Sequence, residues 1–194
     1  MFSDVVFCKD FLELGFSKIY HANLIIANNA KDLRKKISKE FGLVVVLGSH
    51  LNRDAVSNRK VDILLSPHSG VSHDYLSSRN SGLNEVLCKL AKKNDVAVGF
   101  SFSEILNAER LDRSLILGRV MQNVMLCRKF KVPMVLGSFA FEKSEMRPPK
   151  DLISFGMSIG MTPGEAKKAL TFVDEIVKSK HELKDFVSEG VKAL

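Results

Sequence analysis

The hydrophobic pattern of this chain is clearest in residues 79–102. Between Leu83 and Ala91 the apolar residues recur at helical spacing, which predicts a helix with one buried face. The apolar run Val96–Phe100 follows without alternation, and such a run after a helix is typical of a parallel strand buried on both faces. The predicted caps are Asn80 or Ser81 at the start of the helix and Asn94 at its end.

Periodicity elsewhere predicts that strands and helices alternate along the whole chain. Predicted strands cover 5–7, 16–21, 43–48, 61–65, 96–100 and 132–136. Predicted helices cover 9–14, 28–41, 52–60, 103–106, 112–130, 149–159 and 162–178, and a charged helical tail covers 179–194. Polar loops are expected at 66–82 and 137–148, and a loop as long as the first is often functional.

This alternation, with no sign of hairpins, is typical of an α/β fold with a parallel sheet. The 194 residues suit one domain spanning 1–194. Both a TIM-like barrel and a doubly wound sheet satisfy the pattern, although a full eight-fold barrel usually needs about 250 residues. The chain has no GxGxxG or GxxxxGK[ST] motif, so neither nucleotide-binding fingerprint is present. Residues 156–160 read GMSIG and match GxSxG, but they fall at the end of the predicted helix 149–159 and not on a strand-to-helix turn, so no nucleophile elbow is expected.

Composition indicates an ordinary globular chain, with 45% hydrophobic and 26% charged residues. No apolar run reaches the length of a membrane span and no leader opens the chain, so a cytoplasmic location without membrane contact is expected. The three cysteines are far apart, and reduced core thiols are favoured over ligands or a disulfide. The net charge of +7 favours a polyanionic partner.

Histidines at strand ends suggest one enzymatic alternative. His21, His50 and His68 follow predicted strands, and His73 with Asp74 lies just beyond. In a barrel the active site forms at the carboxyl ends of the strands, where imidazole and carboxylate ligands can hold divalent metals and activate water. A stand-alone metal-dependent phosphoesterase is therefore an alternative, although no HxH motif occurs in the chain.

Basic and amide side chains form the second group of candidates. Guanidinium groups bind phosphates through two parallel hydrogen bonds, and phosphate contacts dominate affinity for nucleic acid. Arg119 sits at the edge of an apolar helical arc, so a structural role in binding loop carbonyls competes with a role in RNA binding. A pure protein scaffold with basic surface charge is a further alternative. The candidates for RNA or partner contacts are Arg79, Arg110, Arg119, Gln122, Asn123, Arg128, Lys129, Lys131, Arg147 and Lys150.

Three blocks of sequence resemble a known family. They read SGLNEVLCKLAKKNDVAVGFSFSEIL, LGRVMQNVMLCRKFKVPMVLGS and RPPKDLISFGMSIGM, and together they cover roughly residues 79–161. In this order and spacing they are similar to the thirty-kilodalton-type protein subunit family of ribonuclease P, whose archaeal members are called protein component 3. The first third of the chain matches only loosely.

The resemblance implies a TIM-barrel-like parallel barrel, complete or incomplete, related to the polymerase-and-histidinol-phosphatase phosphoesterases. It implies an endoribonuclease particle that removes the 5′ leader from precursor tRNA, in which an RNA using magnesium is the catalyst. This chain would be a non-catalytic cofactor that binds no metal itself. It would stabilise the RNase P RNA, contact precursor tRNA indirectly, and pair with a ferredoxin-like protein subunit as a two-plus-two assembly. The related phosphoesterases carry HxH on their first strand, where this chain has Ser3–Val6.

Overall fold

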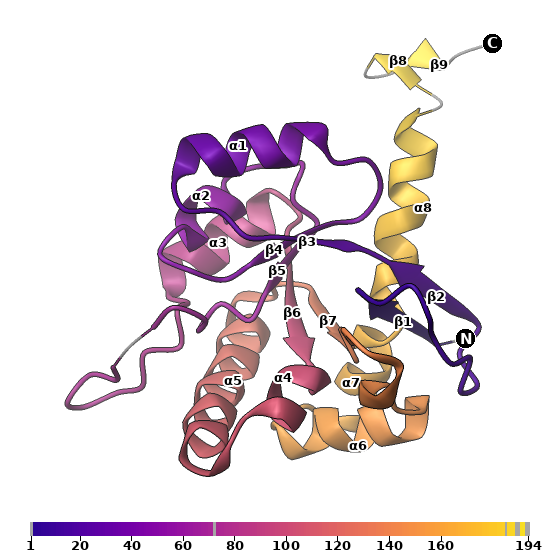
Figure 1. The fold of residues 1–194 in the computed structure, drawn as a ribbon. Coiled ribbons are helices and arrows are strands. Elements are labelled where there is room, and N and C mark those ends of the chain that lie inside the picture. Colours follow the sequence, from indigo (N-terminus) through magenta and orange to yellow (C-terminus); the bar gives the residue numbers. More distant parts are fainter. Residues whose placement is uncertain (1, 72, 185, 189–190, 193–194) are drawn as a thin grey trace.

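The computed structural model describes residues 2–71, 73–184, 186–188 and 191–192, and it confirms the alternation of strands and helices (Figure 1). The strands that build the main sheets pair in parallel throughout. Five of them form one sheet in the order β3-β4-β5-β6-β7, and β1 pairs with β2. These strands are β1 (Ser3–Val6), β2 (Lys18–His21), β3 (Asn23–Ile25), β4 (Val44–Leu47), β5 (Ile63–Leu65), β6 (Ala97–Ser101) and β7 (Met134–Gly137).

Backbone contacts join the two parallel sheets into a ring. Only Ala22 separates β2 from β3, so these two strands carry the ladder from one sheet to the other. On the opposite side the Phe139 N–H donates to the Val5 carbonyl at 2.9 Å, and Val6 bridges Ala140 in parallel. The predicted parallel α/β fold is thus confirmed, and the closed ring with helices outside it is compatible with a TIM-barrel-like fold.

Alternating residues of the strands face two separate cores. Val45, Ile63, Leu65, Ala97 and Val135 belong to a cluster inside the ring, which Val173 closes from α8. The residues between them face outward to the larger cluster under the helices, among them Val44, Val46, Leu64, Val98 and Leu136. This explains the unbroken apolar runs of β4, β5, β6 and β7, since both faces of these strands are buried.

Helices surround the ring, and α5 is the longest of them (Figure 1). The predicted capping box of α7 is present, with the Thr162 side chain accepting from the Glu165 N–H. None of the described helices is long and apolar enough to cross a membrane. The helices are α1 (Ala30–Lys39), α2 (Asn52–Val56), α3 (Glu85–Lys93), α4 (Phe102–Asn107), α5 (Arg110–Phe130), α6 (Pro149–Ser158), α7 (Pro163–Ala169) and α8 (Phe172–Lys184), and the 3-10 helix η1 covers Lys143–Glu145.

Local details of α3, the helix predicted between Leu83 and Ala91, differ from the prediction. Asn84, not Asn80 or Ser81, caps α3, because its side chain accepts from the Leu87 N–H at 2.9 Å. The Ser81 carbonyl instead accepts a hydrogen bond from Asn123, which keeps residues 80–83 in the loop. Asn94 is the C-cap as predicted, but the left-handed residue is Asp95, with a φ of 57°.

Other corrections concern short elements. Residues 9–14 form no helix, since Leu14 and Gly15 have positive φ and make a turn. The predicted helix 162–178 is broken between α7 and α8, where the Ser3 N–H and hydroxyl both donate to the Leu170 carbonyl. The helical tail is wrong beyond Lys184, because β8 (Phe186–Ser188) and β9 (Val191–Lys192) pair antiparallel. The rest of the tail prediction falls on 185, 189–190 and 193–194, outside the described residues.

A buried carboxylate helps to close the ring. Asp4 on β1 accepts hydrogen bonds from the Ser138 N–H at 2.7 Å, the Ser138 hydroxyl at 2.5 Å and the Val5 N–H at 2.9 Å. Burial raises the pKa of Asp4 from 3.8 to about 6, although these hydrogen bonds oppose the rise. Asp4 therefore links β1 to the segment after β7, and in the folded chain its carboxyl keeps its proton to a higher pH than an ordinary aspartic acid does.

We expect this pKa to make stability fall with rising pH. Between pH 3.8 and about 6 the folded state binds the Asp4 proton more tightly than the unfolded state does, so the free energy of unfolding declines as the proton is lost. A shift of roughly two pKa units corresponds to about 3 kcal/mol at most. Asp4→Asn keeps an acceptor for the two N–H groups, so the difference between wild type and variant in urea unfolding isolates this group. An identical pH dependence of the two proteins would contradict the assignment.

Candidate nucleic-acid interface

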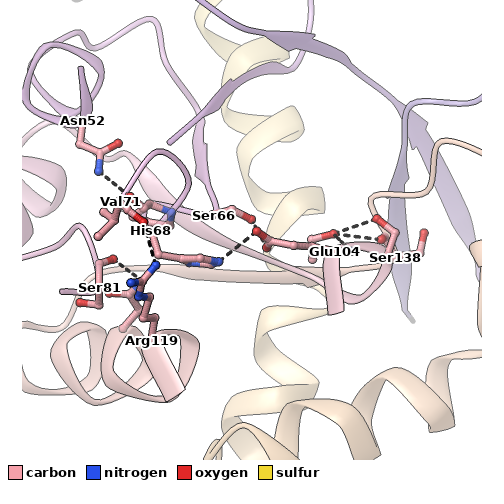
Figure 2. A network of polar contacts seen from close by, with 12 residues as sticks. Asn52, Ser66, His68, Val71, Ser81, Glu104, Arg119 and Ser138 are labelled. Carbon is pink, nitrogen blue, oxygen red and sulfur yellow. Dashed lines mark hydrogen bonds and ion pairs between the residues drawn. The ribbon is translucent and has the colours of Figure 1, made fainter. Parts of the chain in front are cut away.

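The long loop 66–82 is fastened to α5 by a buried arginine. The Arg119 side chain is 9% exposed; its Nε donates to the Asp74 carboxylate at 2.8 Å, and an Nη donates to the Val71 carbonyl at 2.9 Å (Figure 2). The hydrogen bond from the Asn80 N–H and the bond from Arg119 hold the pKa of the Asp74 carboxyl below its usual value. The structural role considered for Arg119 is therefore present, because its Nε–H and one Nη–H donate to groups of the protein itself.

Two asparagines hold the base of the same loop. The Asn123 amide is fully buried on α5 and donates to the Ser81 carbonyl at 3.0 Å. The Asn52 amide on α2 donates to the carbonyls of Pro67 and Gly82, at 2.7 and 3.0 Å. Side chains from two helices thus give the loop a defined shape, although its described residues form no strand or helix.

His68 and Ser66 at the end of β5 converge on Glu104 of α4 (Figure 2). The His68 Nε2 lies 3.0 Å from one Glu104 oxygen, and the Ser66 hydroxyl donates to the other at 2.5 Å. Burial would raise the pKa of the Glu104 carboxyl, but the hydrogen bonds from His68 and Ser66 outweigh it and lower that pKa. Because the hydroxyl contacts the carboxylate and not the imidazole, the imidazole is not placed to activate it as a nucleophile.

The other strand-end histidines do not join this group into a metal centre. His68 is buried, whereas His21, His50 and His73 are exposed. Within the described residues, no three His, Cys, Asp or Glu side chains are grouped so that they could hold a metal ion. The geometry required by the metal-phosphoesterase alternative is therefore not found in this part of the chain. Cys8, Cys88 and Cys127 are free thiols, and burial raises the pKa of Cys88 to about 11.

A polar basin lies between the loop and α3. Its volume is about 560 Å³, which is within the range of small-molecule sites. Two predicted residues meet there, Arg79 from the loop and Gln122 from α5. The Arg79 guanidinium lies over α5 and donates to the Gly118 carbonyl at 3.2 Å. The lining also includes His50, Arg53, Tyr75, Ser78, Asn80 and Asn84, and it contains no carboxylate.

The remaining predicted cations are spread along other elements. Arg110 opens α5, while Lys129 and Lys131 are exposed at its far end. A helix of 21 residues is about 30 Å long, so these ends are well separated. Arg147 donates to the Ser144 and Met146 carbonyls and lies 5.4 Å from the Phe102 ring centre, and Lys150 is exposed on α6. The predicted residues therefore form several positive sites, not one patch.

Arg128 is tied to α7. Its guanidinium forms two bonds with the Glu165 carboxylate, at 2.8 and 2.7 Å, and donates to the Gly160 carbonyl at 2.7 Å. The bond from Arg128, helped by the Thr162 N–H, lowers the pKa of Glu165 to about 2. Lys129 carries no ion pair among the described contacts and lies 5.3 Å from the centre of the Phe130 ring.

This difference gives a prediction for the two neighbours. We expect Lys129→Ala to leave the melting temperature unchanged and to reduce the salt dependence of RNA binding by about one unit of slope, because a single phosphate contact is lost. We expect Arg128→Ala to lower stability by up to about 1 kcal/mol, since the ion pair is partly exposed. Melting curves and RNA titrations at several salt concentrations test both. A salt slope unchanged by Lys129→Ala would remove that residue from the RNA-contact candidates.

Pattern reasoning missed three residues that line the basin. Arg53 lies in the short polar segment 52–60, Tyr75 in the loop and Asn84 at the start of α3. Asn84 lies in the first of the three motif blocks, whereas Arg53 and Tyr75 belong to no motif. Tyr75 carries a weaker signal, because it is one of the two tyrosines of the chain and lies in a long polar loop. Only the folded loop brings it near the arginines.

Comparison with known proteins gives one family. The family model described as RNase P subunit p30 matches residues 18–185. Ribonuclease P protein component 3 of Methanococcoides burtonii is 33% identical over 184 residues, covering 92% of this chain and 73% of that protein. The protein of the same name from Methanothermobacter thermautotrophicus is 29% identical over 198 residues, covering 99% of this chain and 78% of that protein.

A solved structure has the same fold. A chain in the cryo-EM structure of archaeal ribonuclease P with mature tRNA superimposes with a TM-score of 0.78 and 27% identity. The superposition covers 99% of this chain and 87% of that chain. The likeness therefore includes the first third of the sequence, where the motif blocks matched only loosely.

Proposed function

The chain belongs to the RNase P subunit p30 family, and from that premise we propose that it is a protein subunit of a ribonuclease P that removes the 5′ leader from precursor tRNA. The observation that carries the proposal is the superposition of nearly the whole chain on a chain of archaeal ribonuclease P bound to mature tRNA. The three motif blocks, the buried parallel strands and the basic surface support the same assignment.

In this proposal the chain is a non-catalytic cofactor. Catalysis belongs to the RNA component, which uses magnesium. At the strand ends, the Glu104 carboxylate is hydrogen-bonded to Ser66 and to His68. In this proposal these side chains have a structural role, because they link the start of the loop to α4. The exposed cations neutralise phosphates, so that RNA helices pack closely at lower magnesium concentrations. We also propose a relation to the polymerase-and-histidinol-phosphatase enzymes, and this part of the proposal rests only on the family resemblance of the motif blocks.

Partners are the second part of the proposal. We assign the chain a ferredoxin-like protein subunit as partner, in a two-plus-two assembly, within a single-domain architecture and a cytoplasmic particle. The first turns of α5 support a protein contact, because Leu111 and Leu115 lie one turn apart there and are exposed at 81% and 48%. Exposed apolar residues gathered on one helix face are typical of interaction sites.

Reconstitution tests the function. The chain, its ferredoxin-like partner and the cognate RNA are mixed at limiting magnesium, and precursor-tRNA cleavage is followed with each component omitted in turn. We expect cleavage to need the RNA and to rise only when both proteins are present. Cleavage by this chain alone with added divalent metal would overturn the proposal and would return the strand-end histidines to an active site.

A further inference from the structure

The basin between the loop and α3 has a composition that points to a specific ligand. Its lining combines two arginines, one tyrosine and several amides and hydroxyls, without any carboxylate. Carboxylates near the rim are engaged elsewhere: Asp74 with Arg119, Glu85 with Lys89, and Asp54 with Arg34. The basin therefore presents positive charge and hydrogen-bonding groups to an anionic ligand.

The two arginines have free donors. Arg79 uses one N–H on the Gly118 carbonyl, and a guanidinium carries five. Arg53 is exposed near the start of α2, and its side chain has no hydrogen bond or ion pair among the contacts of the described residues. Both guanidinium groups can therefore bind phosphate oxygens in the two-bond geometry.

The loop contributes a surface for stacking. Tyr75 is 65% exposed and Leu76 fully exposed in the loop before α3, and this loop projects from the body of the molecule (Figure 1). The base of the loop is held by Arg119 and Asn123, so the tip is presented on a fixed support. Unpaired bases stack on aromatic rings and hydrogen-bond through their edges to amides such as those of Gln122 and Asn80.

We propose that this basin binds an unpaired segment of RNA, with Arg53 and Arg79 on phosphates and Tyr75 stacked on a base. The inference rests on the proposed function and names the kind of RNA element that this surface takes. An acidic peptide would use the two arginines but would leave the tyrosine and the amides without a matching ligand. A duplex would hide the faces of its bases from the tyrosine and their Watson–Crick edges from the amides, because its bases are stacked and paired.

Binding of a labelled single-stranded RNA of about ten nucleotides by the purified full-length chain tests this. We expect Arg53→Ala with Arg79→Ala to weaken binding about tenfold or more and to flatten its salt dependence by about 0.7 per lost phosphate contact. We expect Tyr75→Ala to weaken binding at least fivefold and Tyr75→Phe to preserve it, because the stacking ring remains. Lys167→Ala, an exposed cation on α7, is the matched control and should change little.

A second variant moves Arg79 without removing its charge. A Cβ on Gly118 would lie 2.5 Å from the Arg79 Cζ, so Gly118→Ala displaces the guanidinium while alanine favours the helix. We expect weaker RNA binding with an unchanged melting temperature. We also expect 4-thiouridine in the RNA to crosslink to the Tyr75 segment of the wild-type chain.

Distinct outcomes overturn the inference. Unchanged affinity in the arginine and tyrosine variants, or crosslinks only elsewhere, would remove the basin from RNA binding while reconstituted cleavage still supports the subunit assignment. Competition by poly-glutamate but not by single-stranded RNA would assign the basin to an acidic protein. Failure of the cleavage assay itself would instead overturn the proposed function.

Discussion

Gly82→Ala is expected to destabilise the folded chain by more than about 3 kcal/mol. Gly82 has a φ of +76°, a conformation that strains any residue with a Cβ. A Cβ there would also overlap the carbonyl oxygen of Pro67, a backbone atom that cannot rotate away. The same carbonyl accepts from Asn52, so relief of the overlap would cost that hydrogen bond as well. Urea unfolding monitored by circular dichroism measures the change.

Gly164→Ala is the matched control. No atom lies within 4 Å of a Cβ at Gly164, and its backbone lies in α7 with no positive φ. Alanine in a helix is favoured over glycine by up to about 1 kcal/mol, so this variant should be as stable as wild type or more so. Equal stability of the Gly82 and Gly164 variants would show that the loop moves away from the added methyl group.

Arg119→Ala is expected to lower the free energy of unfolding by about 2–4 kcal/mol and to release the long loop. The change removes two hydrogen bonds and a buried aliphatic stem, and it leaves the Val71 carbonyl without its donor. Limited proteolysis should then cut within residues 71–79 faster than it does in the wild-type chain. Unfolding experiments on the same protein measure the loss of stability.

Two further variants on α5 serve as comparisons. One separates the contribution of the buried Arg119 stem from that of its hydrogen bonds, and the other is a control. Arg119→Met keeps most of the buried stem and loses the donors, so it should open the loop with a smaller loss of stability. Lys129→Ala removes an exposed cation from α5 and should leave the loop resistant to protease. If the protease cuts the Arg119→Ala variant no faster than the wild-type chain, the loop is held mainly by Asn52 and Asn123.

The candidate site was only partly predictable from sequence. The spacing of Arg119, Gln122 and Asn123 in the sequence is enough to place them on one strip of a helix, because residues three and four apart are neighbours on a helix surface. Their division of labour depends on the loop: Arg119 and Asn123 turn toward its carbonyls, while Gln122 opens on the basin. Arg53 and Tyr75 join them only through the fold, so no spacing rule pointed to them.

The sequence by itself determined the alternation of strands and helices, the two-sided burial of the strands and the family. These features follow from local periodicity and from the motif blocks, and both can be recognised in the sequence without knowledge of long-range contacts. The tertiary structure decided the closing of the ring through Val5 and Phe139, the break between α7 and α8 and the capture of Arg128 by Glu165. Each of these joins residues distant in the chain, and such contacts depend on packing that local periodicity does not encode.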